Sequence, residues 1–553
     1  NTIPKPVFDY NLRGVSVGGP IIKNKLFFFI SGEQERISQP ATSLVANKPG
    51  QTAVPGVISQ AVADTLDKLK DFLIQKFNYN PGQYQGYNYR TQSDKITVRF
   101  DWNINPSNKF TLKYNYLKSF RDIAASNSGA PNGNRQPSNV GLPFSGSGYT
   151  INNNFNILIG ELNSRISNKA SNKFQIGYTA LRDFRASLAG GDFPLVDILN
   201  PQGQTYTSFG YEPFTYNNVL NTNIFQISDI FTYATGQHEL TGGFQIYKKD
   251  FKNGFAPNYE GAYIFNSFTD FYNSVNNGTA NAKSYALQYS LTKDGSFPFA
   301  KIGATEYGFF AQDKWRVKDN FNLTYGFRLD IPVFQNKFDA NPNVINLTFR
   351  DGKKYDVGAK PGNNALFSPR LGFNWDVFSN QKTQVRGGIG SFSGPPPFVW
   401  ISNQASNNGV QFGSFSNTIN PATGLPYVFK SDINAYRPAS GTTPTTYNLV
   451  FTDKGFKYPQ VLKTSIAVDQ KLPRDFVVSA EFSFSKDLNA VNFENVNLPS
   501  TGAAFVGPDG RIRYSSTKIY SGAGGATVTN PNITNAILMK NYKKGTYYFF
   551  THQ

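Results

Sequence analysis

Apolar and polar residues alternate along residues 368–392, SPRLGFNWDVFSNQKTQVRGGIGSF. Every second position is apolar, in the order Leu371, Phe373, Trp375 and Val377. The positions between them are polar or small: Arg370, Gly372, Asn374 and Asp376. After a short turn-like stretch, Val385 and Ile389 continue the apolar phase and Arg386 the polar one. A period of two residues predicts a β-hairpin with one apolar face and one polar face.

The same unit recurs along the chain. Ile96 to Trp102 alternates with a polar phase that holds Arg99 and Asp101, and residues 307–330 repeat the pattern with Arg328 and Asp330 in the polar phase. Short connections close the hairpins at IIKNK, NPSNK, SNKASNK, ATGQ, VKDN, SNQK and LPRD. About seven hairpins and a last run from about Ile537 predict about fifteen antiparallel strands.

Short and long connections alternate between the predicted strands. Residues 121–154, 251–303 and 395–460 are long connections rich in Asn, Ser, Gly, Pro and Tyr. One end of the sheet is therefore expected to be bare and the other to carry extended loops. Residues 57–77 show helical spacing of apolar residues and predict a helix at the long-loop end, packed over the sheet.

Residues directly opposite each other in an antiparallel pair point to the same face of the sheet. If the apolar residues of both strands are to share one face, the hairpin loop must contain an odd number of residues. We expect Val377 opposite Val385 and Asp376 opposite Arg386, with residues 380–382 as the loop. The same reasoning places residues 318–320 in the loop of the preceding hairpin, between Val317 and Phe321.

Composition narrows the class of protein. Phe, Tyr and Trp make up 15% of the 553 residues, and 49 Gly and 32 Pro supply turns. The longest apolar run, Leu26 to Ile30, excludes membrane-spanning helices, which need about 20 apolar residues. A soluble sandwich or propeller has strands of about five to six residues and loops of similar length at both ends. Alternation over about nine residues with asymmetric loops favours a transmembrane β-barrel instead.

In a barrel the apolar phase faces lipid and the polar phase a wet lumen. The predicted lumen-lining residues are Arg99, Asp101, Arg328, Asp330, Arg370, Asn374, Asp376 and Arg386. Among the long loops, the stretch PPPFVWISNQ suggests ligand contacts through four side chains that could stack on sugars or hold a peptide, or simply pack on themselves: Phe398, Trp400, Asn403 and Gln404.

The sequence shows little sign of nucleic-acid binding, a metal site or a catalytic nucleophile. The net charge of +18 reflects few acidic residues, and its basic residues are scattered, which argues against nucleic-acid binding. There is no Cys, and His238 and His552 are the two histidines. His238 lies beside a short turn in QHELTG, which lacks a second metal-binding His, and GSFSG has Phe392 where a nucleophile would be needed. We expect no enzyme activity, no cofactor and no metal site.

Several of these stretches resemble a known family. TEYGFFAQDKWRVKDNFNLTYGFRLDIPVF is similar to the signature barrel hairpin of TonB-dependent outer-membrane transporters. LFSPRLGFNWDVF, TQVRGGIGSFSGPPPFVWISNQASNNGV and LRGVSVGGPIIKNKLFFFISGEQE are similar to the Oar-like branch. The resemblance implies a barrel of about 22 strands with an N-terminal plug. We therefore expect residues 1–553 to be a partial barrel domain, with plug, TonB-contacting segment and closing strands outside this sequence.

Two functions stay open. The first is an energised transporter of the Gram-negative outer membrane that moves a large or scarce substrate and whose missing N-terminal region contacts TonB. The second is a passive pore or an adhesive surface barrel. Both imply contact with outer-membrane lipid and lipopolysaccharide.

Overall fold

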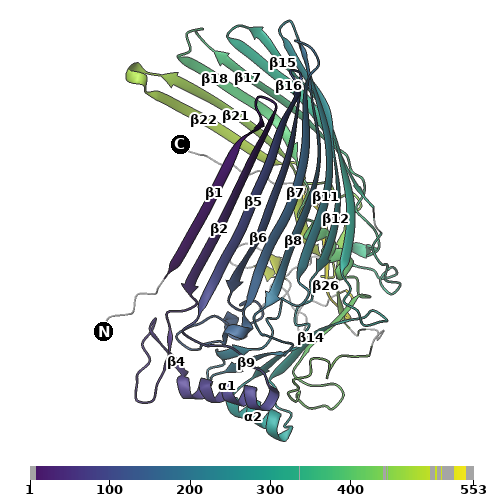
Figure 1. The fold of residues 1–553 in the computed structure, drawn as a ribbon. Helices are drawn as coiled ribbons and strands as arrows, with labels where there is room; N and C mark the ends of the chain where they lie inside the picture. Colours follow the sequence, from purple (N-terminus) through teal and green to yellow (C-terminus); the bar gives the residue numbers. More distant parts are fainter. Residues whose placement is uncertain are drawn as a thin grey trace.

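The computed structural model describes residues 8–335, 337–439, 444, 446–498, 505–506, 512–513 and 529–542. Fourteen strands form one antiparallel sheet in chain order, a single curved wall (Figure 1). They are β1 (Asp9–Ile22), β2 (Leu26–Pro40), β5 (Asn88–Asn105), β6 (Asn108–Ile123), β7 (Tyr149–Arg165), β8 (Ala170–Ser187), β11 (Val219–Thr235), β12 (His238–Gly254), β15 (Ala300–Lys318), β16 (Phe321–Phe334), β17 (Leu366–Asp376), β18 (Thr383–Ser393), β21 (Gln460–Lys471) and β22 (Val477–Asp487).

All seven predicted hairpins are present in this wall. The expected fifteenth strand is not part of it. Residues near Ile537 form β26 (Ile533–Tyr542), which lies between β20 (Tyr447–Thr452) and β23 (Ala490–Asn495) in a separate sheet. The β20–β26 pairing is parallel, and residue alternation along one strand carries no information about such a distant partner.

The sheet has two edges among the described strands. β1 pairs only with β2, and β22 pairs only with β21. β1, the first described strand, thus lies at one edge of the sheet. Asn1 and Gln553 themselves lie outside the described residues.

The β17–β18 register differs from the predicted one by two residues. Trp375 lies opposite Val385, and Asp376 lies opposite Gln384. The predicted pairs of Val377 with Val385 and Asp376 with Arg386 are therefore wrong, although the predicted parity holds. The loop is wider than expected because residues 379 and 381 adopt positive φ angles of 55° and 58°.

The β15–β16 hairpin follows the predicted register along its length but closes more tightly. Arg316 lies opposite Asn322, as the prediction requires. The last pair is Lys318 with Phe321, and the register shifts between Arg316 and Lys318. The shift is a β-bulge that places Lys318 in the strand. The loop therefore consists of residues 319 and 320, and the predicted loop of residues 318–320 is one residue too long.

The predicted apolar phase is exposed along the wall. Phe327, Leu371 and Ile389 are 48%, 46% and 45% exposed, although soluble proteins bury such side chains. This is the arrangement expected of a sheet face that hydrocarbon covers.

Three of the four tryptophans mark one end of this outward face. Trp102, Trp315 and Trp375 share the exposed phase and lie within three residues of a short turn, at the end where the strands are bare of long loops. Tryptophan collects at the boundary between hydrocarbon and headgroups. The short turns therefore mark one membrane surface. Within the described residues, no helix combines the length and apolarity needed to cross a membrane.

The long connections fold together at the other end of the wall, and we call this assembly the loop canopy (Figure 1). Its five-stranded sheet consists of β10 (Thr205–Phe209), β9 (Leu195–Leu199), β13 (Ala262–Phe265), β14 (Ser284–Ser290) and β19 (Phe412–Asn417). Its other elements are β3 (Val45–Asn47), β4 (Ile58–Val62), α1 (Ala63–Phe77), α2 (Phe268–Asn277), α3 (Phe398–Ser406) and short 3₁₀ turns at Pro131–Gly133, Ser145–Ser147 and Arg350–Gly352. Outside the canopy, a 3₁₀ turn at Pro473–Asp475 lies in the β21–β22 hairpin loop, and β24 (Phe505–Val506) pairs with β25 (Ile512–Arg513).

The predicted helix is present but shorter and packs elsewhere. Residues 58–62 form β4, and α1 begins at Ala63. Leu66, Leu69 and Leu73 are fully buried in the canopy core with Phe271 of α2. The helix thus covers the canopy sheet rather than the large wall.

A buried ion pair joins two canopy loops. Arg135, in the β6–β7 connection, contacts Asp197 of β9 at 3.0 Å, and their side chains are 4% and 1% exposed. Ser208 donates a 2.6 Å hydrogen bond to the same carboxylate, and Arg135 also donates to backbone carbonyls, including that of Ser126. The Arg135 and Asp197 charges are therefore paired with each other inside the canopy, where an unpaired charge would be costly.

Replacing Arg135 with Leu should destabilise the protein by about 3–5 kcal/mol, because Asp197 would stay buried without its cation. Urea unfolding of the full-length protein in lipid vesicles measures the change. The matched control is Arg36→Leu, since the Arg36–Asp94 pair is 31% and 43% exposed and should contribute no more than about 1 kcal/mol. If both variants lost the same small amount of unfolding free energy, the Arg135–Asp197 pair would not stabilise the canopy as described.

Candidate functional site

The predicted lumen-lining residues all belong to the phase opposite the exposed apolar one, but they do not form a single cluster. Arg99 and Asp101 lie on β5. Arg328, Asp330 and Arg370 line a pocket on β16 and β17. The remaining three lie nearer the short turns on β17 and β18: Asn374, Asp376 and Arg386.

On β5 the predicted pair is a local ion pair. The Arg99 Nε–Asp101 Oδ2 distance is 2.7 Å, and Lys109 of β6 approaches the same carboxylate at 3.2 Å. Thr111 donates a 2.8 Å hydrogen bond to Asp101. This carboxylate holds neighbouring strands together on their polar face.

Near the short turns, Arg386 pairs with acidic residues that the sequence pattern did not single out. Its Nε lies 2.9 Å from Asp469 of β21, and its Nη2 lies 3.5 Å from Glu481 of β22. The predicted neighbour Asp376 instead accepts a hydrogen bond from the backbone of Gln381. Asn374 accepts one from Gln384 at 2.7 Å. The two-residue register shift explains the change of partner.

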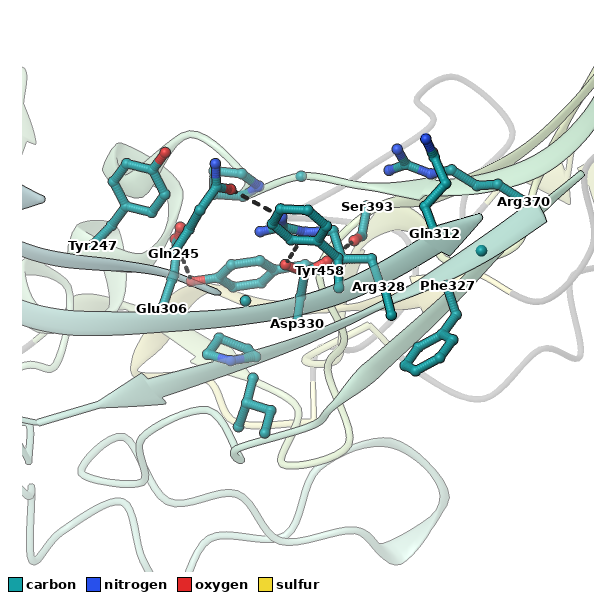
Figure 2. A pocket seen from close by; sticks show the side chains of 18 residues that line it. Gln245, Tyr247, Glu306, Gln312, Phe327, Arg328, Asp330, Arg370, Ser393 and Tyr458 are labelled. Carbon is teal, nitrogen blue, oxygen red and sulfur yellow. Dashed lines mark hydrogen bonds and ion pairs between the residues drawn. The ribbon is translucent and has the colours of Figure 1, made fainter. Parts of the chain in front are cut away.

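A cavity of about 480 Å³ opens on the polar face of β12, β15, β16 and β17 (Figure 2). Its wall combines charged, amide and aromatic side chains with two glycines of the strands. The side chains that give it its chemistry are Gln245, Tyr247, Glu306, Phe310, Gln312, Arg328, Asp330, Arg370 and Tyr458.

Arg328 is held in place from three strands. Its Nε lies 2.7 Å from Asp330 Oδ1, and its Nη1 donates to Gln245 of β12 at 2.9 Å. Ser393 of β18 donates to the other oxygen of Asp330 at 2.8 Å. Gly308 makes room for this arrangement, since a Cβ there would collide with the Arg328 guanidinium.

A second group of side chains, with Glu306 and Tyr458 close together, lines the same cavity (Figure 2). Tyr458 donates a 3.3 Å hydrogen bond to Glu306, and Lys249 contacts the other carboxylate oxygen at 2.7 Å. Burial, with help from Glu306, raises the pKa of the Tyr458 phenol, so it stays a donor. Glu306 directly precedes the predicted run of residues 307–330 and continues its polar phase, so alternation could have identified it. Tyr458 lies in a loop, where the alternation of apolar and polar residues carries no information about position.

Arg370 is the basic residue of the cavity that faces an aromatic ring. Its guanidinium carbon lies 4.7 Å from the centre of the Phe392 ring. A cation over an aromatic face is stabilised without a carboxylate partner. Such a guanidinium can still donate hydrogen bonds to a ligand.

The four loop residues predicted to contact a ligand lie on α3. Phe398 is buried and stacks on Phe251 at 4.1 Å, and Gln404 is fully buried with its amide donating to two backbone carbonyls. These two side chains are part of the packing. Trp400 and Asn403 are half-buried, and Trp400 lies edge-on to Phe493. Ligand contact through these two side chains stays a prediction.

One canopy carboxyl stands apart electrostatically. Glu260 is 3% exposed, and neither of its side-chain oxygens has a hydrogen-bond partner among the described residues. Burial and, to a smaller extent, the nearby Asp192 raise its pKa, Arg437 opposes the shift, and the resulting pKa is about 8. These groups come from three canopy loops, so this junction is sensitive to protonation.

The arrangement suits the binding of a polar ligand. The described residues contain no group of three or more His, Asp or Glu side chains able to hold a metal ion. The cavity offers paired carboxylates, one guanidinium that faces an aromatic ring, hydrogen-bonding amides and the Ser393 hydroxyl, which donates to Asp330. Such a surface can hold and release a polar ligand.

Fold and site together define a β-barrel chain of the outer membrane. The chain belongs to the outer membrane beta barrel domain family, whose model matches residues 1–550. It therefore lies in the outer membrane, and the class predicted from the sequence is confirmed. No curated protein sequence matches the chain.

The chain is similar to solved structures of outer-membrane proteins at low sequence identity. The outer membrane transporter YddB from Escherichia coli has a TM-score of 0.53 and 13% identity, over 97% of this chain and 50% of YddB. A variant of the ferric enterobactin receptor PfeA from Pseudomonas aeruginosa gives 0.48 and 10%, over 96% and 55%. The siderophore receptor PirA from Acinetobacter baumannii gives 0.47 and 12%, over 97% and 55%. The chain thus spans about half the length of these proteins.

Replacing Gly308 with Ala should destabilise the barrel by about 1–3 kcal/mol, because the added methyl group displaces Arg328. Unfolding in lipid vesicles measures the loss. Gly372→Ala is the control, since its Cβ would meet nothing nearer than a carbonyl at 3.6 Å. In an Arg328→Ala background the Gly308→Ala cost should nearly vanish, and an unchanged cost would show that Arg328 is not the cause.

The Glu260 carboxyl should make canopy stability depend on pH. Its pKa is about 8 in the folded protein and near 4.5 when unfolded, so its proton favours the folded canopy. The stability this proton supplies is complete below pH 4.5 and lost as the pH rises to about 8. Hydrogen exchange of the canopy, corrected for the intrinsic pH dependence of exchange, should therefore show increasing opening between pH 5 and 8.

Two variants separate this effect from general loosening. The amide of Glu260→Gln does not titrate, so this variant should abolish the increase in canopy opening between pH 5 and 8. This holds even if the substitution changes canopy stability by the same amount at every pH. Asp192→Asn removes the neighbouring negative charge and should shift the slope to lower pH. If canopy opening still depended on pH in Glu260→Gln, the dependence could not come from Glu260.

Proposed function

We propose that the full-length protein is a TonB-dependent transporter, which moves a substrate across the outer membrane with energy supplied from the inner membrane. The observation that carries the proposal is the cavity on the polar face beside the canopy. It offers a polar ligand charged, amide and aromatic contacts within the wall that would line a lumen. A wide barrel tolerates these groups because its interior is filled with water or another folded piece.

The energy for transport must come from elsewhere because the protein lies in the outer membrane. The outer membrane has no ATP, so work against a gradient must come through the periplasm. The fourteen-stranded wall has no described element that would receive such work. The plug and TonB-contacting segment that the sequence resemblance implies would supply it, and this chain alone should not transport. The substrate is expected to be too large or too scarce for simple diffusion.

A surface-binding role or passive pore is the second candidate. It is favoured by the extent to which the canopy folds as a unit, with its own sheet, helices and buried Arg135–Asp197 pair. In that case the canopy would be the working part and the wall its anchor. Either role places the outward face against lipid and the canopy among lipopolysaccharide.

The test compares the full-length protein with a variant lacking its TonB-contacting segment, in cells where the substrate has been identified by screening. The proposal predicts that uptake is lost in the variant and also on collapse of the proton gradient in cells with the intact protein. Immunoblots of outer-membrane fractions control for equal abundance. Equal uptake by both, or uptake that survives loss of the gradient, would favour the passive pore.

A further inference from the structure

The outward face carries one polar cluster that the lumen site does not use. His238 begins β12, next to a short turn, and Trp315 lies directly opposite on β15. Asp313 belongs to the same exposed phase of β15, and Tyr325 lies opposite it on β16. From the sequence, His238 is a polar residue that flanks a turn. In the structure it has two partners on β15, and one of them, Asp313, is also bound by Tyr325 of β16.

The cluster has a defined geometry. His238 Nδ1 lies 2.7 Å from Asp313 Oδ2, and the Tyr325 hydroxyl donates to the same oxygen at 2.9 Å. The His238 ring stacks on the Trp315 indole, with centres 5.4 Å apart and planes 15° apart. An ionised carboxylate only accepts hydrogen bonds, so His238 Nδ1 carries its hydrogen. Nε2 is then the ring nitrogen left for another partner.

The burial of the pair decides which group can meet a ligand. Asp313 is 5% exposed, and its second oxygen has no hydrogen-bond partner among the described residues. The His238 side chain is 39% exposed. An outside molecule therefore meets the imidazole, while the carboxylate beneath it orients the ring and complements a positive charge on it.

The position in the wall indicates what that molecule is. The outward face contacts lipid, and the tryptophans near the short turns mark the headgroup boundary. Trp102 lies between Leu26 and Phe110, and Trp375 lies between Phe321 and Val385. Only Trp315 among these three has a histidine and a carboxylate beside it. A buried acid on a membrane-facing strand is unfavourable without a specific partner.

We propose that His238, oriented by Asp313 and flanked by Trp315 and Tyr325, binds the phosphodiester of a glycerophospholipid in the periplasmic leaflet. Short turns of such barrels lie at the periplasmic side, where glycerophospholipid headgroups meet the wall. With a hydrogen on both ring nitrogens, the imidazole can donate its Nε2 hydrogen to a phosphate oxygen, and the indole covers the lipid glycerol region. This binding depends on the outer-membrane location and not on the proposed transport function.

The experiment measures lipid retained by the full-length protein in detergent, using native mass spectrometry. Three probes with the same oleoyl chains are compared: dioleoyl-phosphatidylglycerol, dioleoyl-phosphatidylethanolamine and dioleoylglycerol, which has no phosphate. The proposal predicts that both phospholipids are retained and dioleoylglycerol is not. Retention of phosphatidylethanolamine alone would point to its ammonium group and overturn the proposal, as would equal retention of all three.

His238→Gln should lower phospholipid retention about tenfold, the effect of losing one hydrogen bond to a charged group. Asp313→Asn should lower it as well, because the ring loses its charged partner. Asp229→Asn is the matched control, since Asp229 shares the outward phase of β11 and contacts Asn172 at 2.8 Å but has no histidine. Retention by His238→Gln at the level of the unmodified protein, or an equal loss in Asp229→Asn, would overturn the proposal.

Circular dichroism and thermal unfolding in the same detergent confirm that each variant is folded before lipid is added. His238 lies at the first residue of its strand and is partly exposed, so its replacement leaves the wall intact even if Asp313→Asn does not fold. The result for His238→Gln therefore decides the proposal by itself.

Discussion

Hydrocarbon offers a peptide group no hydrogen-bond partner, and the wall depends on this constraint. A membrane-crossing sheet must satisfy its N–H and C=O groups between strands, so each strand is paired along its length with its sequence neighbour. With the backbone satisfied, the side chains divide by phase. One phase, with Phe327 and Leu371, is exposed and apolar, and the other holds the charges.

On the polar face of the wall and in the canopy, charged side chains are accommodated by water or by ion pairs. On the polar face Asp101 and Asp330 each pair with an arginine of their own strand, and Asp469 pairs with Arg386 of the neighbouring strand. Lys109 of β6 also approaches Asp101, so some of these charges join neighbouring strands. In the canopy the Arg135–Asp197 pair is compensated, whereas Glu260 is not and holds its proton to about pH 8. The lumen cavity lies where these two regions meet, with Glu306 supplied by the wall and Tyr458 by a loop.

Local alternation was enough to predict the seven hairpins, the outward and inward phases and the barrel class. It could not set the β17–β18 register, because positive φ angles at Ser379 and Gln381 widen the loop while preserving parity. It placed Arg328 and Asp330 on the inward face but could not identify Tyr458, since loop residues reach the cavity only through tertiary folding. The partners of His238 were hidden for the same reason: Asp313 lies on another strand, and its acidic side chain breaks the apolar phase.

The most direct test of this account is the accessibility of consecutive positions on one strand. The chain has no cysteine, so single cysteines from Leu323 to Asp330 of β16 can be spin-labelled in lipid vesicles without background. Collision rates with oxygen, which concentrates in the bilayer, and with a water-soluble nickel complex should alternate with a period of two. Labels at Leu323, Phe327 and Leu329 should meet oxygen, and those at even positions the nickel complex. Uniform accessibility, or the opposite phase, would contradict a wall with lipid on one face and water on the other.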